Sequence, residues 1–243
     1  MRLLLITAAL LPLSACHASW DHDGKGGGYN AKEAGPMASR TYDVAAFNAV
    51  DLRGSDDVDV KTGTAFSVTA EGDPKILDQL EITVVNGTLR VGRKDGKWFG
   101  GDDSGVVVRV VMPKLQSASV AGSGDLTVDR AEGDVSAAIA GSGNLSIADL
   151  RGGAADLSIA GSGDLSVKGV AAKLSAAIAG SGDIEAGGLT ASTADVSIAG
   201  SGSVKGVVKG AASVSIMGSG DVELTGGAKC TVSALGSGEA RCT

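Results

Sequence analysis

The residues best suited to chemistry in this sequence are acidic side chains that recur after a Gly-Ser-Gly motif. The motif occurs seven times, and in most copies an acidic or amide residue follows its serine by two positions, as at Asp164 and Asp183. A row of carboxylates suits a cation such as calcium, which makes Asp164 and Asp183 a candidate metal site. However, Asn144 and Ser203 interrupt the row, and Asp or Asn beside a tight turn commonly accepts hydrogen bonds from backbone N–H groups. We therefore expect turn-capping residues, with no metal ion and no cofactor.

A second group of charged residues would suit an enzyme that acts on glycans. Asp102 and Asp103 follow Arg93 and Lys94 in one glycine-rich segment, and glycosidases and lyases need paired carboxylates or a carboxylate with a basic partner. Serine catalysis has no support, because both histidines precede residue 23 and no general base is placed beside a serine. Charges in such loops are usually solvated, so we expect a non-catalytic protein, with a glycan-active lyase or hydrolase as the alternative.

The same segment, residues 93–105, places Trp98 and Phe99 among charges. Two large aromatic side chains in a polar loop either cover the end of an apolar core or form an exposed contact site. The first interpretation is the simpler one. The second makes Trp98 and Phe99 the predicted binding loop for a partner, because aromatic side chains contribute far more contact energy than small polar ones.

The N-terminal residues predict export and lipid attachment. Met1 and Arg2 precede an apolar run at residues 3–13, which is too short to span a membrane and is typical of a signal peptide. The run ends in Leu-Ser-Ala-Cys, which resembles the lipobox of bacterial lipoproteins. We expect residues 1–15 to be the signal peptide and Cys16 to carry the lipid, palmitate included. By the same resemblance, His17 after the cysteine favours the outer membrane.

Charge and cysteine content limit the partners of the exported chain. Without Arg2 the chain carries 20 Lys and Arg against 28 Asp and Glu, a net charge of about −8, which argues against nucleic acid as a partner. The membrane is contacted through the lipid, and an envelope glycan or protein is the expected ligand. Once Cys16 is lipidated, Cys230 and Cys242 remain as one pair, and an oxidising compartment predicts a disulfide between them.

Residues 16–39 mix glycine, charge and small side chains without any period, so we expect a flexible tether there. Residues 40–113 read as irregular strands, with a tight turn at Asn86-Gly87 and a helical turn or two within residues 74–80. The run at residues 105–112 is nearly all valine and predicts a buried strand. Domain boundaries therefore fall near residues 16 and 40.

Residues 114–243 are a repeat of 16 to 20 residues centred on the Gly-Ser-Gly motif. Apolar residues alternate with small polar ones on both sides of the motif, which predicts two short strands per repeat with one buried face. Such a repeat must stack on its neighbours to bury that face. Stacked coils of a β-solenoid and an antiparallel β meander both fit, and position-by-position matching with no aromatic residue after Phe99 favours the solenoid.

The whole of residues 40–243 resembles the head GIN domain family, whose members are labelled auto-transporter adhesins and have no established activity. The resemblance rests on the order and spacing of five short tracts: residues 47–50 (FNAV), 54–60 (GSDDVDV), 87–89 (GTL), 112–115 (MPKL) and 122–125 (GSGD). It implies an all-β fold, a right-handed parallel β-helix, and an adhesin-like role in the cell envelope. It supplies no catalytic residues.

Overall fold

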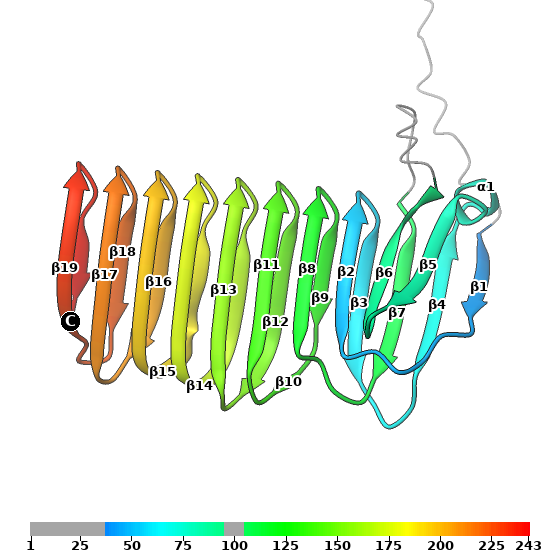
Figure 1. Ribbon diagram of the computed structural model, residues 1–243, viewed down its shortest axis with the longest axis horizontal. Coiled ribbons are helices and arrows are strands. Elements are labelled where there is room, and N and C mark those ends of the chain that lie inside the picture. Colours follow the sequence, from blue (N-terminus) through cyan, green and yellow to red (C-terminus); the bar gives the residue numbers. More distant parts are fainter. Residues whose placement is uncertain (1–36, 95–104) are drawn as a thin grey trace, which may run out of the picture. The chain divides into compact units, whose positions relative to one another are not determined.

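The computed structural model describes residues 37–94 and 105–243, and these residues form a parallel β-solenoid (Figure 1). Each coil contributes one strand to a first face, turns at a glycine-rich corner, and contributes a second strand to the opposite face. Parallel pairing between successive coils excludes the antiparallel meander, since Ile139 pairs in register with Val120 and with Ile159. No helix in the described part of the chain is long and apolar enough to cross a membrane.

The strands fall into three groups. The first face consists of β6 (Thr88–Arg93), β2 (Ala49–Gly54), β8 (Ser117–Gly122), β11 (Val135–Gly141), β13 (Ala154–Gly161), β17 (Ala211–Gly218) and β19 (Lys229–Gly236). The second face consists of β7 (Val107–Met112), β3 (Asp57–Thr62), β9 (Asp125–Val128), β12 (Asn144–Arg151), β16 (Ser203–Val208), β18 (Asp221–Thr225) and β20 (Ala240–Cys242). Two long strands, β14 (Leu165–Gly180) and β15 (Ile184–Gly200), run through both faces, and the short β10 (Ala131–Glu132) pairs with the end of β12.

The interior is a set of apolar columns, one residue per coil. The residue three before the motif serine is buried in six successive coils, as are Leu126, Leu145 and Leu165 three after it. The alternation that predicted one buried face is therefore confirmed for these coils. The last coil differs, because Ala234 at the same position is exposed and has no coil beyond it.

The corners explain why glycine flanks the serine. Gly161 has φ of 138°, and a Cβ there would lie 2.1 Å from the carbonyl oxygen of Gly141 in the preceding coil. A Cβ on Gly163 would lie 2.0 Å from the carbonyl oxygen of Gly143. Only glycine lets backbone stack on backbone this closely. The Ser162 N–H then donates to the Gly141 carbonyl at 2.9 Å, which joins the corners of adjacent coils.

The N-terminal end is closed by antiparallel strands (Figure 1). The coil formed by β2 and β3 lies between the β8–β9 coil and the β6–β7 coil, so the order in the stack differs from the order in the sequence. Beyond the β6–β7 coil the pairing is antiparallel. β5 (Leu80–Val85) pairs with β6, and β4 (Ser67–Gly72) pairs with β7 and with β1 (Ala38–Tyr42). The one-turn helix α1 (Pro74–Leu77) buries Leu77 at this end.

The predicted elements of this region are confirmed, with two differences. Asn86 and Gly87 form the expected turn with φ of 52° and 76°. Strand β1 begins at Ala38, two residues before the predicted start of the domain. The valine-rich strand β7 is buried on one face only, because Arg109 on its outer face reaches solvent and forms an ion pair with Glu71.

Candidate binding site

The outer surface of the first face changes character from one end of the stack to the other. In the repeat coils its outward positions hold small residues, such as Ala121, Ala140 and Ala160, which line a shallow groove of about 560 Å³. At the N-terminal end the equivalent positions hold long polar side chains. Register pairs Glu81 with Gly92 and Arg53 with Ala121. Gly92 lies beside Arg53, because a Cβ built on Gly92 would come within 3.4 Å of the Arg53 Cβ.

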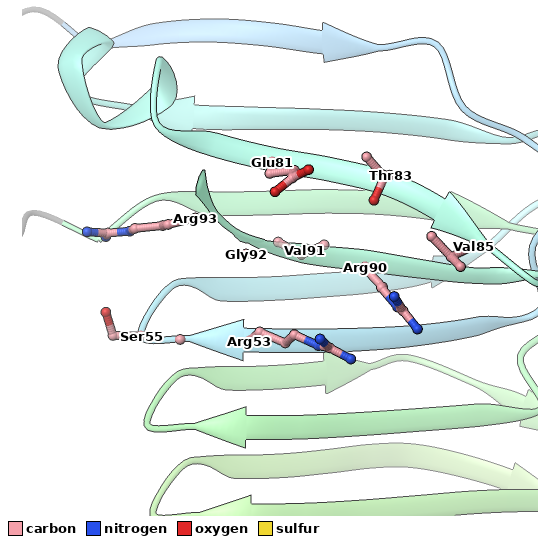
Figure 2. A pocket seen from close by; sticks show the side chains of 10 residues that line it. Arg53, Ser55, Glu81, Thr83, Val85, Arg90, Val91, Gly92 and Arg93 are labelled. Atoms are coloured by element: carbon pink, nitrogen blue, oxygen red, sulfur yellow. The ribbon is translucent and has the colours of Figure 1, made fainter. Parts of the chain in front are cut away.

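These long side chains surround a cavity of about 540 Å³ on strands β5, β6 and β2 (Figure 2). Gly92 forms its floor, and a Cβ built there would come within 3.3 Å of the Arg53 carbonyl oxygen. Figure 2 shows Arg53 and Arg90 extending from neighbouring strands toward the same side of the cavity, opposite Glu81 and Thr83 on β5. The missing side chain at Gly92 therefore leaves a hollow lined by donors on one side and by a carboxylate and a hydroxyl on the other.

Asp51 holds Arg53 in place, and Arg90 lies next to Asp51 in the sheet. Its carboxylate accepts from Arg53 Nε at 2.8 Å and from Ser119 Oγ at 2.9 Å, and its side chain is only 14% exposed. In the strand register, Arg90 of β6 lies opposite Asp51 of β2 on one side and opposite Thr83 of β5 on the other. The Arg90 Nε is buried and has no hydrogen-bond partner among the described residues. A buried donor without an acceptor costs about 1–3 kcal/mol, so the Arg90 side chain retains unused hydrogen-bonding capacity.

A buried ion pair lies at the edge of the cavity. Arg93 donates from Nε and Nη2 to the two carboxylate oxygens of Asp56, at 3.1 and 2.9 Å, and the Asp56 side chain is 0% exposed. Lys94 Nζ bonds the Asp78 carbonyl oxygen at 3.0 Å. These two cations, which the sequence offered as partners for Asp102 and Asp103 in an enzyme site, are thus bound to structural groups.

The segment that carries Trp98 and Phe99 starts beside this ion pair. Residues 55–56 connect the two strands of the β2–β3 coil, whereas residues 94–106 make the equivalent connection between β6 and β7. The corner of this coil is therefore an insertion next to the cavity. Trp98 and Phe99 themselves, like Asp102 and Asp103, lie outside the described residues.

The acidic row after the corners joins adjacent coils. Asp183 Oδ1 accepts from the Ser203 backbone N–H at 2.7 Å and from its hydroxyl at 2.8 Å, and Asp164 Oδ1 accepts from the Asp183 N–H at 3.2 Å. Each side chain therefore caps the next coil and not its own turn. No group of three or more metal-ligating side chains occurs in the described ranges, which include Asp164 and Asp183.

The cysteines at the far end are joined. A disulfide connects Cys230 of β19 with Cys242 of β20, with their Cα atoms 6.3 Å apart. It links the two faces of the last coil, where both side chains are half-buried. Cys16 lies outside the described residues, so its lipidation remains a prediction.

Sequence reasoning did not identify the cavity residues Arg53, Arg90, Glu81 and Gly92. A signal was present, because most outward positions on the first face of the repeat coils hold Ala or Ser and the first coils break that pattern with arginine. Finding it required the register between β2, β6 and β8, which spans a sequence separation of 68 residues between Asp51 and Ser119. No short sequence motif indicates that strands so far apart in the sequence pair with each other.

The described residues form a parallel β-solenoid, and comparisons with known proteins assign its family. Residues 46–228 match the family described as "Putative auto-transporter adhesin, head GIN domain", and the chain belongs to this family. This description indicates an exported protein and names no enzyme activity. No curated protein matches the chain.

Solved structures share the fold. A "putative adhesin" from Bacteroides fragilis superposes with a TM-score of 0.79 at 20% identity, covering 86% of this chain and 98% of its own. A "putative lipid binding protein" from Parabacteroides distasonis gives 0.67 at 22% identity, covering 86% and 97%. A "putative adhesin" from Parabacteroides merdae gives 0.67 at 19% identity with the same coverage. At these identities the likeness establishes the parallel β-solenoid alone.

Proposed function

We propose that this protein is a non-catalytic, adhesin-like lipoprotein of the cell envelope that binds a glycan in the cavity of β2, β5 and β6. The observation that carries the proposal is the ring of hydrogen-bonding side chains around the glycine floor. Arg53 and Arg90 supply planar donors, while Glu81 and Thr83 supply acceptors across from them. Adjacent hydroxyl groups of a sugar both donate and accept, so they match a cavity that presents both kinds of group.

The charge balance favours a neutral glycan over an acidic one. Three arginines at the cavity face three carboxylates, because Asp51 pairs with Arg53, Asp56 pairs with Arg93, and Glu81 lies across Gly92 from Arg53. An anionic ligand would gain from Arg90 and lose against Glu81. A polyhydroxylated neutral ligand uses every group without this conflict.

The aromatic segment supports the same ligand class. Trp98 and Phe99 lie within the insertion that begins at the edge of the cavity. Aromatic rings pack on the apolar C–H surfaces of sugars and bury large areas at low entropic cost. We infer that this pair contacts the same ligand.

The anchor places this site at a membrane surface. The lipid on Cys16, with the tether of residues 16–39, would hold the solenoid at the outer membrane and let the cavity sample its surroundings. Two acyl chains or more are needed for stable attachment, and lipobox processing supplies them. The net negative charge of the exported chain argues against nucleic acid and against an anionic lipid surface as the ligand.

A binding panel tests the cavity. The full chain is titrated with the neutral polysaccharides xylan, laminarin and dextran and with the acidic polygalacturonate, and release of reducing ends is measured in parallel. Gly92→Leu should reduce binding of the preferred neutral polysaccharide at least tenfold, because the new side chain fills the cavity. Ser213→Leu, an outward change to the same residue on β17, is the matched control and should bind normally. Preference for polygalacturonate, normal binding by Gly92→Leu, or turnover of any polysaccharide would contradict the proposal.

The aromatic pair is tested separately. Trp98→Ala combined with Phe99→Ala should weaken capture of the same polysaccharide while the circular dichroism spectrum and the melting temperature stay unchanged. A loss of folding stability instead would show that the two rings cover the core. Unchanged binding of the polysaccharide would show that the contact site lies outside the loop.

Lipidation has its own test in cells. Cys16→Ala should abolish palmitate labelling and membrane fractionation, because the thiol is the acceptor of the diacylglyceryl group. Ser14→Ala keeps a small residue before the cysteine and should be labelled normally. A Cys16→Ala chain that still labels and still sediments with membranes would refute the anchor.

A further inference from the structure

The C-terminal end of the solenoid leaves two strands with an unpaired edge. β19 pairs with β17, and β20 pairs with β18, and within the described ranges no strand pairs with the other side of either one. The backbone N–H and C=O groups on those sides therefore point away from the stack. Free strand edges of this kind readily pair with another chain.

The apolar interior is also open at this end. Val232 is 46% exposed, whereas Val214, which pairs with it in the coil below, is 1% exposed. Leu235 on the outer side of the same strand is 71% exposed. The N-terminal end has no such opening, because β1, β4, β5 and α1 cover it (Figure 1).

The β19 edge lacks three of the features that usually protect a free edge. Proteins block free edges with proline, a bulge, or a charged side chain that points inward, and β19 has none of these between Lys229 and Gly236. Its inward residues are Cys230, Val232 and Ala234. The Cys230–Cys242 disulfide holds both edge strands in one arrangement, which lowers the entropic cost of pairing with a partner.

We propose that this end binds the same end of a second copy of the chain, related by a two-fold axis perpendicular to the stack. The chain reverses at the corner between β19 and β20, so the two edges run in opposite directions. A two-fold axis across them places each edge antiparallel to an edge of the second copy, and both faces gain hydrogen bonds at once. Such a contact is self-complementary and closes at two copies.

The charges on β20 are self-complementary in this arrangement. Glu239 and Arg241 lie two residues apart, are 67% and 77% exposed, and bond each other at 3.1 Å within one chain. Antiparallel pairing about Ala240 places Glu239 opposite Arg241 of the second copy, and Arg241 opposite its Glu239. Opposite charges in cross-strand positions stabilise a pair of strands, and the same geometry occurs twice.

The apolar residues of β19 fit the same two-fold axis. Antiparallel pairing about Ser233 places Val232 of one copy opposite Ala234 of the other, so each open column is covered by its symmetry mate. Binding of the closed N-terminal end would instead join unlike surfaces and continue into a filament. The dimer leaves the glycan cavity uncovered and does not depend on the proposed function.

Sedimentation velocity on the full chain, purified in detergent over a range of concentrations, tests the dimer. Val232→Lys should raise the dimer dissociation constant at least tenfold, because it places a charge in the contact. Ser215→Lys puts the same charge on the outward side of β17, one coil away from the contact, and should change the constant less than threefold. A chain that stays monomeric, a series of larger species, or a dimer that Val232→Lys leaves intact would overturn the proposal.

A charge exchange identifies the partner as a second copy. Glu239→Arg alone and Arg241→Glu alone should each weaken the dimer, because each places like charges opposite one another. The double exchange restores both attractive pairs and should return the constant to within threefold of the original. A double variant as weak as the single ones would overturn the two-fold pairing. Circular dichroism and free-thiol counting confirm that each variant is folded with its disulfide intact.

Discussion

The N-terminal end and the repeat coils share one coil geometry and differ in how that geometry is held together. Side-chain hydrogen bonds between repeat coils join residues 18 to 20 positions apart, as in Ser166 with Ser146. At the N-terminal end they join residues 68 positions apart, as in Ser119 with Asp51. The repeat coils are stabilised by near neighbours, whereas the end that forms the cavity depends on long-range pairing.

The outer surfaces differ in the same way. On the first face of the repeat coils most outward positions hold small residues, because each side chain there lies beside its equivalent in the next coil. The N-terminal coils escape that constraint and can hold Arg53, Arg90 and Glu81 around one glycine. The repeat coils therefore act as a scaffold, and the cavity forms at the N-terminal end, where the repeat pattern stops.

The largest effect is expected from Ile178→Asp in the repeat region. Ile178 is 3% exposed in the middle of an apolar column, so an aspartate there is buried without a partner and should destabilise the protein by about 5 kcal/mol. Ser197→Asp, on the outward side of the neighbouring coil, should change stability by less than about 0.5 kcal/mol. Chemical denaturation measures both. Equal losses would contradict the assignment of inward and outward positions.

Asp56→Ala should have the next largest effect and should act on the N-terminal end. It removes the partner of Arg93, whose side chain is only 12% exposed, and a broken buried ion pair of this kind costs about 3 kcal/mol. Hydrogen exchange should rise in β6 and β7 and stay unchanged in β13. The matched control Asp195→Ala breaks the exposed pair with Lys173 and should have a much smaller effect, because solvent screens an exposed pair. Exchange that rises equally in all coils would remove the distinction between the two regions.

Replacing both Cys230 and Cys242 by alanine should destabilise the last coil by about 2 kcal/mol. The disulfide spans 12 residues and limits the conformations of the unfolded segment. Because the coil has only one neighbour, exchange should increase in β19 and β20 alone. Counting free thiols in the denatured, unreduced protein checks the bond itself, and two reactive thiols from this pair would show that it does not form.

The smallest effect is expected from Asp183→Ala, which removes one capping bond between coils. Loss of the bonds to Ser203 should cost about 1 kcal/mol, while Asp183→Asn should cost less, because Asn144 already bonds the next coil from the equivalent position. Thermal melting with and without added calcium gives the second readout. A calcium-dependent rise in melting temperature that Asp183→Ala abolishes would restore the metal interpretation.

The fold was predictable from the sequence because its causes are local. A glycine-rich corner, alternating apolar residues and matching positions in successive repeats indicate a stacked solenoid without reference to distant residues. The sequence fitted both a β-solenoid and an antiparallel meander, which differ in which strands pair. The structure shows parallel pairing of equivalent positions, as at Ile139 and Ile159. The Asp164 and Asp183 caps were predictable for the same reason, although they bond the next coil.

The cavity was not predictable because no local pattern encodes it. It arises where β5, β6 and β2 meet in a stacking order that the sequence does not follow. Arg53 and Arg90 are 37 residues apart in sequence. They come close together only because β2 pairs with β6 in this stacking order. Exposed arginines in separate strands would ordinarily be taken as solvated surface residues.

The equivalence of the repeat coils bears on how the protein can change in length during evolution. A duplicated coil of about 19 residues would meet glycine with glycine at its corners and would extend the apolar columns by one residue each. The coils on either side of it would separate by one strand spacing, ~4.8 Å, and keep all their own residues. The number of repeats therefore sets the distance between the cavity and the opposite end of the stack. This distance changes in steps of one coil, and the residues at either end stay the same.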